Sequence, residues 1–247
     1  MSSIVVMPTY NEAENLPLLA ERIMDLEGFH LLVVDDNSPD GTGDLAEGLR
    51  YRYPGRLLVL HRPGKLGLGT AYLEGFRVAL RLRHSNLFQM DADFSHDPAD
   101  LPRLLAELRR GADLVIGSRY APGGGTRDWP GWRLALSRGG SLYAGLVLGL
   151  PIRDLTGGFR GWRRSALLDL GLDEVRSRGY SFQIEMAFRC ARKGKRVVEV
   201  PIQFRERRRG ASKMSAAILV EAVLTVWRLR LEGVGLPRPL RQVLMGR

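Results

Sequence analysis

Short apolar runs alternate with helical segments through the first 117 residues, and this alternation constrains the fold more than any other feature. The segments between the runs have the length and periodicity of helices. Strands that alternate with such helices form βαβ units, because parallel neighbours need a crossover connection. We therefore expect an α/β fold with a Rossmann-like, mainly parallel central sheet flanked by helices. The predicted strands cover residues 4–8, 31–34, 57–60, 87–90 and 113–117.

Acidic side chains follow three of these strands. Glu12 comes after the first strand, Asp36 after the second, and Asp91 and Asp93 after the fourth. The carboxyl ends of parallel strands lie on one edge of the sheet, where open α/β sheets bind ligands, so these side chains are expected to converge. A solvated turn explains one acid triplet, whereas three converging ends favour a ligand site. Two adjacent carboxylates are typical of Mg²⁺ or Mn²⁺ held together with substrate phosphates.

Charge and cysteine content limit the class of function. The 247 residues contain 37 Lys and Arg against 27 Asp and Glu, a formal charge of +10, and a single cysteine, Cys190. One cysteine excludes a disulfide framework, and a reducing, cytosolic setting is the default. Arginine dominates after Arg103 without any nucleic-acid motif, which favours phosphate ligands and lipid headgroups over nucleic acid. No apolar run is long enough to predict a membrane span, and the first residues predict a strand rather than a signal peptide.

The regular alternation stops after residue 117. The tail predicts an amphipathic, basic helix over 214–231 that suits either a membrane interface or core packing. We divide the chain into a main α/β domain over residues 1–212 and a C-terminal helix with a basic tail over 213–247. The elements expected between are a flexible loop over 118–125, an apolar helix through Ser137 to residue 150, a turn-rich segment over 154–160, a helix over 180–191 and one strand over 196–204.

Five short motifs occur in the order that one known family shows. They are Pro-Thr-Tyr-Asn-Glu at residues 8–12, Val-Asp-Asp-Asn-Ser-Pro-Asp-Gly-Thr at 34–42, Asp-Ala-Asp at 91–93, Gly-Ser-Arg-Tyr at 117–120 and Gly-Ala-Ser-Lys-Met at 210–214. On these motifs the chain resembles the polyprenyl-phosphate (dolichol-phosphate) mannose synthases of glycosyltransferase family 2, over residues 3 to about 230. The resemblance implies a GT-A fold without an appended transmembrane domain.

The resemblance also implies roles for individual residues. Asp93 would be the principal metal ligand, with Ser95 assisting through a bridging water. Catalysis would rest on Asp91, Asp93, Arg119 and Arg133. The acceptor phosphate would meet Arg119, Arg133 and Ser137. The nucleotide-sugar donor would be bound by Pro8, Tyr10, Glu12, Val34, Asp36, Asp91, Ala92, Asp93, Arg119, Arg207 and Lys213.

The function that this resemblance implies is metal-dependent, inverting transfer of mannose from GDP-mannose to a polyprenyl (dolichyl) monophosphate, with Mg²⁺ or Mn²⁺ as cofactor. The chemistry agrees, because a phosphate monoester is already anionic at pH 7 and needs cations rather than a general base. Two alternatives stay open: UDP-glucose as donor, and a non-catalytic nucleotide-sugar-binding protein on the same fold. With a lipid acceptor, we expect peripheral attachment to the cytoplasmic face of a membrane.

Overall fold

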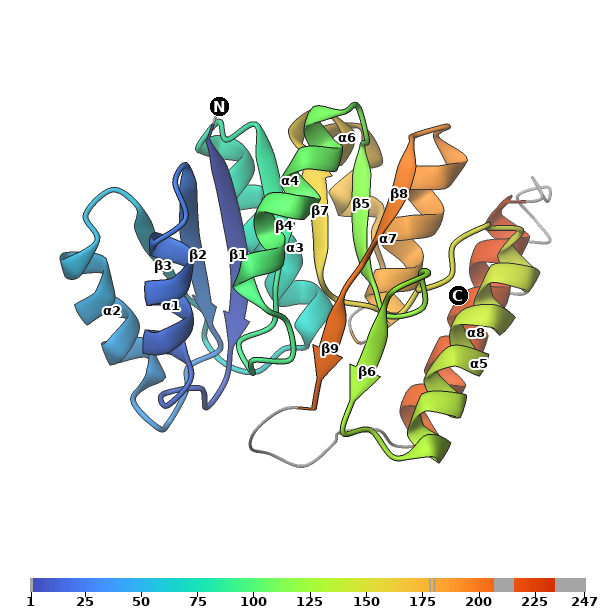
Figure 1. Cartoon of the computed structure of the whole chain (residues 1–247), viewed down its shortest axis with the longest axis horizontal. Helices are drawn as coiled ribbons and strands as arrows, with labels where there is room; N and C mark the ends of the chain where they lie inside the picture. The colour runs from blue at the N-terminus through green and yellow to red at the C-terminus, as the bar shows by residue number, and fades with distance from the viewer. Residues whose placement is uncertain (1, 178, 180, 207–215, 234–247) are drawn as a thin grey trace.

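The computed structural model describes residues 2–177, 179, 181–206 and 216–233, and within them one twisted sheet lies between two layers of helices (Figure 1). The strand order is β3-β2-β1-β4-β7-β5-β8, and every neighbouring pair is parallel except those made by β7. The predicted α/β fold with a mainly parallel sheet is confirmed. The strands are β1 Ser3–Thr9, β2 Phe29–Asp35, β3 Leu57–His61, β4 Asn86–Gln89, β5 Leu114–Ser118, β7 Arg160–Arg163 and β8 Val197–Pro201.

Both faces of the sheet are buried, which explains why its strands read as continuous apolar runs. Side chains alternate along a strand, so Val5 and Met7 enter one core while Ile4 and Val6 enter the other. The first core is covered by α1 Leu16–Met24, α2 Thr42–Arg52 and α4 Leu101–Arg109, the last preceded by the 3₁₀ turn Pro98–Asp100. The second core is covered by α3 Leu68–Arg81, α5 Gly131–Leu148, α6 Arg164–Leu170, the 3₁₀ turn Leu172–Glu174, α7 Ser181–Arg192 and α8 Ala216–Gly233.

Strand β7 was not predicted from the sequence. It runs antiparallel between β4 and β5, in a segment that lacks an apolar run. Gly161 permits this insertion, because a Cβ there would lie 2.8 Å from the Phe88 ring. Trp162 stabilises it by donating from Nε1 to Gln89 Oε1 at 2.8 Å. The sheet therefore contains an inserted strand that is marked in the sequence by one glycine and one aromatic residue.

The single strand expected over residues 196–204 is in fact two strands. β8 ends at Pro201, which lacks the N–H needed to continue the ladder, and β9 Gln203–Arg205 then pairs with β6 Gly125–Arg127. The segment expected to be a flexible loop thus ends in a strand. We call the β6–β9 pair the ribbon. It extends beyond the carboxyl ends of β5 and β8 and borders the edge of the sheet where the acidic residues lie (Figure 1).

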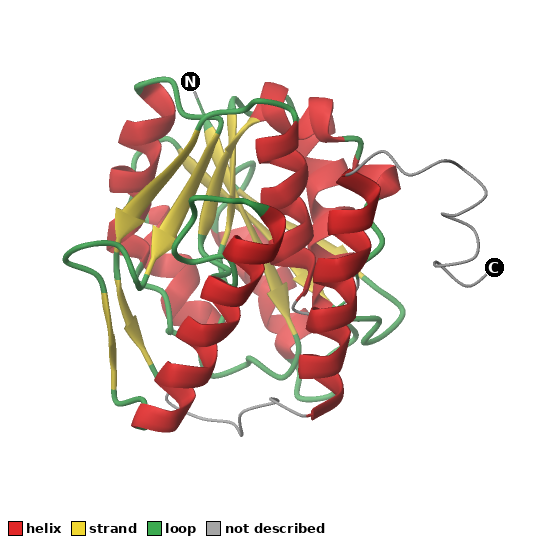
Figure 2. Ribbon diagram, turned by 90° about the vertical axis from the view of Figure 1, so that its right-hand side faces the viewer, coloured by secondary structure: helices red, strands yellow, loops and turns green. Residues whose placement is uncertain are grey.

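Helices α5 and α8 lie side by side at the end of the sheet (Figure 2). Val226 and Leu229 of α8 are buried in the core, whereas Leu224 and Trp227 are exposed. Arg228 joins α8 to α7 through the buried carboxylate of Glu185, with Nη2 2.9 Å from Oε2. Helix α8 therefore packs on the domain and also presents an apolar face. The predicted boundary between residues 212 and 213 falls outside the described residues, within which no helix is long and apolar enough to cross a membrane.

Two neighbouring histidine rings at the amino-terminal edge of the sheet predict acid sensitivity of the fold. The rings of His30 and His84 are 4.6 Å apart, and burial, followed by the charge of His30, lowers the pKa of His84. The unfolded chain takes up a proton below about pH 6.5 that the folded protein resists, so stability falls as the pH drops from 7. We expect the melting temperature of His84→Gln to decline less between pH 7 and pH 5 than that of the wild type; parallel curves would contradict this.

Candidate active site

The carboxyl ends of β1, β2 and β4 lie side by side on one edge of the sheet, because these strands are parallel neighbours (Figure 1). Tyr10 and Glu12 follow β1, Asp36 follows β2, and Asp91 and Asp93 follow β4. The structure thus brings together the three acidic strand ends that the sequence places there. This edge is where open α/β sheets bind ligands.

At the end of β2, Asp36 is held by an arginine that the sequence analysis did not single out. Arg62 Nη1 lies 2.5 Å from Asp36 Oδ1, and both side chains are almost fully buried. Burial raises the pKa of Asp36, while Arg62 opposes that effect. The Lys65 ammonium lies 4.2 Å from the centre of the Tyr10 ring. The segments that follow β1 and β2 therefore combine an anchored acid with an aromatic ring in contact with a cation.

The remaining residues expected near the nucleoside contribute differently. Val34 is fully buried, and a Cβ on Gly75 of α3 would lie 3.0 Å from its Cγ2 atom. Its side chain therefore belongs to the core. Pro8 is half-buried near the end of β1, and Glu12 accepts a hydrogen bond of 2.8 Å from Asn15 Nδ2 at the start of α1.

The acid triplet is ordered by neighbouring hydroxyl groups. Tyr72 Oη donates to Asp91 Oδ1 at 2.9 Å. Ser95 donates to Asp93 Oδ1 twice, from its backbone nitrogen at 3.0 Å and from Oγ at 2.5 Å. Ala92 lies buried between the two acids. Ser95 thus contacts the Asp93 carboxylate directly, and its expected part in metal binding stays a prediction.

Asp91 and Asp93 fit a divalent cation that takes most of its ligands from a bound substrate and from water rather than from the protein. Within the described residues, no group of three or more His, Cys, Asp and Glu side chains is arranged to hold a metal ion. Mg²⁺ and Mn²⁺ do not require such a cage, because they use one or two carboxylates and complete their shells with substrate phosphates and water. Asp91 and Asp93, with one carboxylate fixed by Ser95, supply that kind of oxygen donor set.

His96 is packed rather than poised to move protons. Its ring stacks on Phe159 at 5.0 Å and meets the edge of Phe204 at 5.4 Å. Its Nδ1 atom accepts from the backbone nitrogen of Asp91 at 3.4 Å. Burial lowers the pKa of His96, so the neutral ring is favoured at pH 7. The imidazole therefore stabilises the conformation of the loop that carries Asp91 and Asp93.

Arg119, the residue after β5, forms a buried two-point ion pair with Asp154. The distances are 2.7 Å from Nε to Oδ2 and 2.6 Å from Nη2 to Oδ1. Gly157 donates its backbone N–H to the same carboxylate at 2.9 Å. Burial alone would raise the pKa of Asp154, but Arg119 outweighs it and holds the pKa below its ordinary value. Asp154, which the sequence analysis did not name, fixes the position of Arg119.

Helix α5 brings the other two predicted acceptor residues to the same region. Tyr120, which directly follows Arg119 in the chain, donates from Oη to Ser137 Oγ at 2.7 Å. Arg133 pairs with Glu206 at 2.5 Å, and its guanidinium lies 4.4 Å from the Trp129 ring. The structure therefore gathers Arg119, Arg133 and Ser137 around one cluster of aromatic and polar groups.

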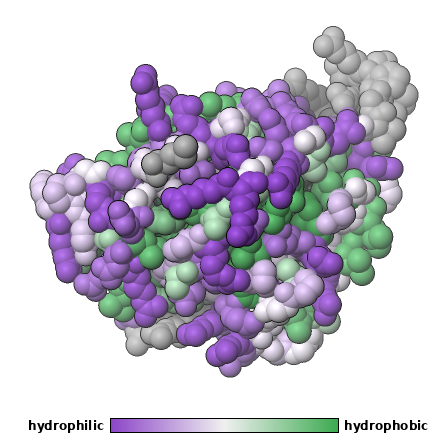
Figure 3. Space-filling model, turned by 45° about the horizontal axis from the view of Figure 1, so that its top comes forward, coloured by the Kyte–Doolittle hydropathy of each residue, from purple (hydrophilic) through white to green (hydrophobic). Residues whose placement is uncertain are grey.

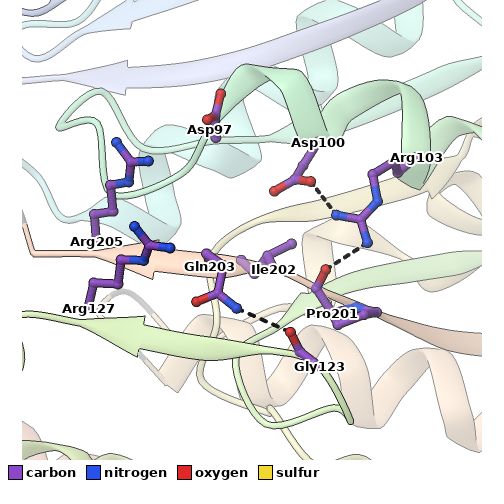
Figure 4. A pocket seen from close by; sticks show the side chains of 9 residues that line it. All are labelled: Asp97, Asp100, Arg103, Gly123, Arg127, Pro201, Ile202, Gln203 and Arg205. Atoms are coloured by element: carbon purple, nitrogen blue, oxygen red, sulfur yellow. Dashed lines mark hydrogen bonds and ion pairs between the residues drawn. The ribbon is translucent and has the colours of Figure 1, made fainter.

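The ribbon separates this cluster from a hollow of about 320 Å³ (Figure 4). Phe204, on one face of β9, lies 5.5 Å from the Arg119 guanidinium and contacts His96. Arg205 of β9 and Arg127 of β6, which are paired across the ribbon, line the hollow. The hollow is lined by Asp97, Asp100, Arg103, Gly123, Arg127, Pro201, Ile202, Gln203 and Arg205. The predicted donor residues Arg207 and Lys213 follow the ribbon and lie outside the described residues.

A fully buried arginine, also missed from the sequence, supports the wall of the site. Arg160 donates to the carbonyl oxygens of Leu155, Gly157 and Gln183 at distances of 2.6 to 2.9 Å. Burial lowers its pKa to about 10, so it stays charged at pH 7. It ties the turn that holds Asp154 to the first turn of α7.

A mainly parallel α/β sheet with acidic strand ends and buried arginines beside them is typical of proteins that bind phosphorylated ligands at the strand-end edge. The family model described as glycosyl transferase family 2 matches residues 4–171. The chain belongs to this family and is a glycosyltransferase.

Two curated relatives are half identical to the chain. The polyprenol monophosphomannose synthase of Mycolicibacterium smegmatis is 50% identical over 231 residues, which cover 92% of this chain and 87% of that protein. The undecaprenyl-phosphate mannosyltransferase of Micrococcus luteus is 51% identical over 229 residues, which cover 92% and 93% of the two chains. The chain thus matches these relatives over most of their length.

Solved structures support the GT-A fold. One is a glucosyl-3-phosphoglycerate synthase from Mycobacterium tuberculosis in complex with Mn²⁺, UDP and phosphoglyceric acid, with a TM-score of 0.65 at 20% identity. The match covers 96% of this chain and 79% of the synthase chain. Another is a mannosyltransferase from Pyrobaculum calidifontis in complex with GDP-mannose and Mn²⁺, with a TM-score of 0.59 at 17% identity. The match covers 98% of this chain and 68% of the mannosyltransferase chain. At these identities the likeness shows the fold alone.

Proposed function

We propose that this glycosyltransferase transfers mannose from GDP-mannose to a polyprenyl monophosphate and forms a β-linked polyprenyl-phosphate mannose. The observation that carries the proposal is the position of Arg119, whose guanidinium is fixed by Asp154. The Phe204 ring contacts both this guanidinium and His96, in the loop that carries Asp91 and Asp93. The names of the two half-identical relatives, a polyprenol monophosphomannose synthase and an undecaprenyl-phosphate mannosyltransferase, support the same acceptor and sugar.

The acceptor side suits a phosphate monoester. A nucleophile that is already anionic needs no general base, and His96, the one histidine at the acid triplet, is packed between aromatic rings. Such a nucleophile does need cations, because two anions must approach each other. Arg119 and Arg133 offer that charge from β5 and α5, and Ser137 offers a hydroxyl beside them.

The donor side suits a nucleoside diphosphate sugar. Asp91 and Asp93 would hold Mg²⁺ or Mn²⁺, which when bound neutralises charge on the departing diphosphate. Tyr72 and Ser95 fix the two carboxylates, and Arg62 fixes Asp36 near the nucleoside. Arg207 and Lys213 would add cations from the segment after the ribbon.

A donor panel tests the proposal. We expect labelled sugar to pass from GDP-mannose to a polyprenyl phosphate with Mg²⁺ or Mn²⁺, and EDTA to stop the reaction. Transfer from UDP-glucose alone would retain the chemistry and change the donor. Binding of GDP without turnover from any nucleotide sugar would instead favour a non-catalytic binding protein.

The lipid acceptor leads us to propose peripheral attachment to the cytoplasmic face of a membrane through the exposed side of α5 and α8. Figure 3 shows apolar residues toward the right-hand edge of a largely polar face, on the side where Figure 1 places these helices. Exposed arginines on the same helices, Arg138 and Arg230, suit anionic headgroups. The exposed apolar side chains are Trp132, Leu142, Leu146, Val220, Val223, Leu224 and Trp227.

A pair of charge insertions tests this surface. Leu142 and Leu146 are 64% and 74% exposed on α5, so replacing both with Glu leaves the core intact. We expect Leu142→Glu/Leu146→Glu to lose most binding to vesicles that contain phosphatidylglycerol in a flotation assay at low salt. Leu45→Glu, at an exposed leucine of α2, is the matched control and is expected to bind as the wild type does. Equal binding by all three proteins would contradict the proposed surface.

A further inference from the structure

A buried tyrosine of α3 contacts the acid triplet from inside the core. Tyr72 has no exposed surface, and its ring stacks on Phe182 of α7 with an interplanar angle of 4° and a centroid distance of 6.0 Å. Phe76, one turn along α3, lies 6.1 Å away on the same core. A tyrosine ring has two side-chain torsions, and packing against both neighbours fixes them. The direction of its hydroxyl is therefore set by the fold rather than by the ligand.

That hydroxyl points at the half-buried acid of the triplet. Tyr72 Oη lies 2.9 Å from Asp91 Oδ1 and donates to it. A hydrogen bond to a carboxylate is roughly twice as strong as one between neutral groups. Because the tyrosine is fully buried, water has no easy route to replace the donor if the hydroxyl is removed. The contact therefore has a large influence on how the carboxylate is oriented.

The second oxygen of the same carboxylate faces a glycine turn. A Cβ on Gly158 would lie 3.3 Å from Asp91 Oδ2, which is tighter than most Cβ contacts. The turn is held in place by Arg160, which donates to the carbonyl oxygen of Gly157 at 2.9 Å. Asp91 thus lies between a buried hydroxyl on one side and a braced backbone on the other, which narrows the range of torsions open to it.

We infer that Tyr72 is a positioning residue for sugar transfer, acting through Asp91, whose carboxylate it holds in the orientation that meets the donor. Tyr72 does not itself reach the substrate, because it is enclosed by the core. The inference rests on the proposed function and adds to it the group that orders the first acid of the triplet. None of the motifs in the sequence contains this residue.

Tyr72→Phe tests the inference, because it removes one oxygen and keeps the ring that packs against Phe182. We expect kcat for transfer from GDP-mannose to fall about 10- to 100-fold, the factor typical of one lost hydrogen bond to a charged group. The KM for the donor is expected to change less than threefold, and calorimetric GDP binding is expected to keep full stoichiometry. These two readouts separate a misoriented carboxylate from a partly unfolded protein.

Tyr143→Phe is the matched control. Tyr143 of α5 has a buried hydroxyl without a hydrogen-bond partner among the described residues, so removing it takes no contact from the site. Its kcat is expected to stay within twofold of the wild-type value. A Tyr72→Phe enzyme with wild-type kcat would overturn the inference while leaving the proposed function intact, whereas an inactive wild type would overturn the proposed function itself.

A double-mutant cycle shows whether Tyr72 acts through Asp91. In an Asp91→Asn background, followed with labelled donor at high enzyme concentration, Tyr72→Phe is expected to lower the rate less than twofold, because its target is already altered. The same 10- to 100-fold loss in that background would overturn the inference, since Tyr72 would then act on another group.

Discussion

Asp93→Asn is expected to abolish most sugar transfer, with a loss of about a thousandfold in kcat. A metal ion held by Asp93 would supply several kcal/mol of charge stabilisation on the departing diphosphate, and that energy corresponds to a factor of this size. Asn is isosteric and keeps an oxygen acceptor for the backbone nitrogen and hydroxyl of Ser95, so the loop is expected to keep its shape. Initial rates with labelled GDP-mannose across a Mn²⁺ titration measure the loss.

Asp97→Asn provides the control for this experiment. Asp97 is an exposed acid of the same loop, lines the hollow on the far side of the ribbon, and caps the next turn by accepting from the Ala99 nitrogen at 3.0 Å. Asn is an equally good cap, so activity is expected within twofold of the wild-type value. If Asp93→Asn retained wild-type turnover, the assigned metal-binding role of Asp93 would be wrong.

The second large effect is expected from the Arg119–Asp154 pair, in which both side chains are almost fully buried. Asp154→Ala leaves the guanidinium without its counter-ion, and breaking such a pair costs about 3–5 kcal/mol of unfolding free energy. Transfer is expected to fall as well, because Arg119 loses its fixed orientation. Chemical denaturation and initial rates measure the two losses separately.

Two further variants separate stability from function at this pair. Replacing both partners, as in Arg119→Met/Asp154→Leu, removes the uncompensated charge, so stability is expected to return while transfer stays lost. Asp173→Asn breaks the exposed Arg77–Asp173 pair and is expected to cost less than about 1 kcal/mol. Recovery of transfer in the double variant would show that Arg119 has no part in the reaction.

The layered fold could be predicted because its signal is local. Continuous apolar runs identify the strands that are buried on both faces, and their acidic ends identify the ligand edge. β7 carries no such run, because it is four residues long and two of them are arginines. The separate strand β9 was also missed, since it depends on pairing with β6, a segment that is distant in sequence.

The candidate site likewise contains residues that the sequence predicts and residues that it does not. Residues in compact motifs, such as Asp91 and Asp93, could be singled out because they directly follow a predicted strand. The residues that hold them could not, because Tyr72 and Asp154 gain their roles only through contacts with chain segments 19 and 35 positions away. Arg160 was also missed, since an arginine with no exposed surface that binds three carbonyl oxygens has no pattern in the sequence.

The most direct test of the account is the structure of the product made from GDP-mannose and a polyprenyl monophosphate, compared with the matching polyprenol that lacks the phosphate. We expect a metal-dependent product from the phosphate only, heavier by one hexose, with a β-anomeric phosphodiester linkage visible by NMR. Transfer to the free polyprenol hydroxyl, or an α-linked product, would contradict an inverting reaction in which the arginines receive an anionic phosphate nucleophile.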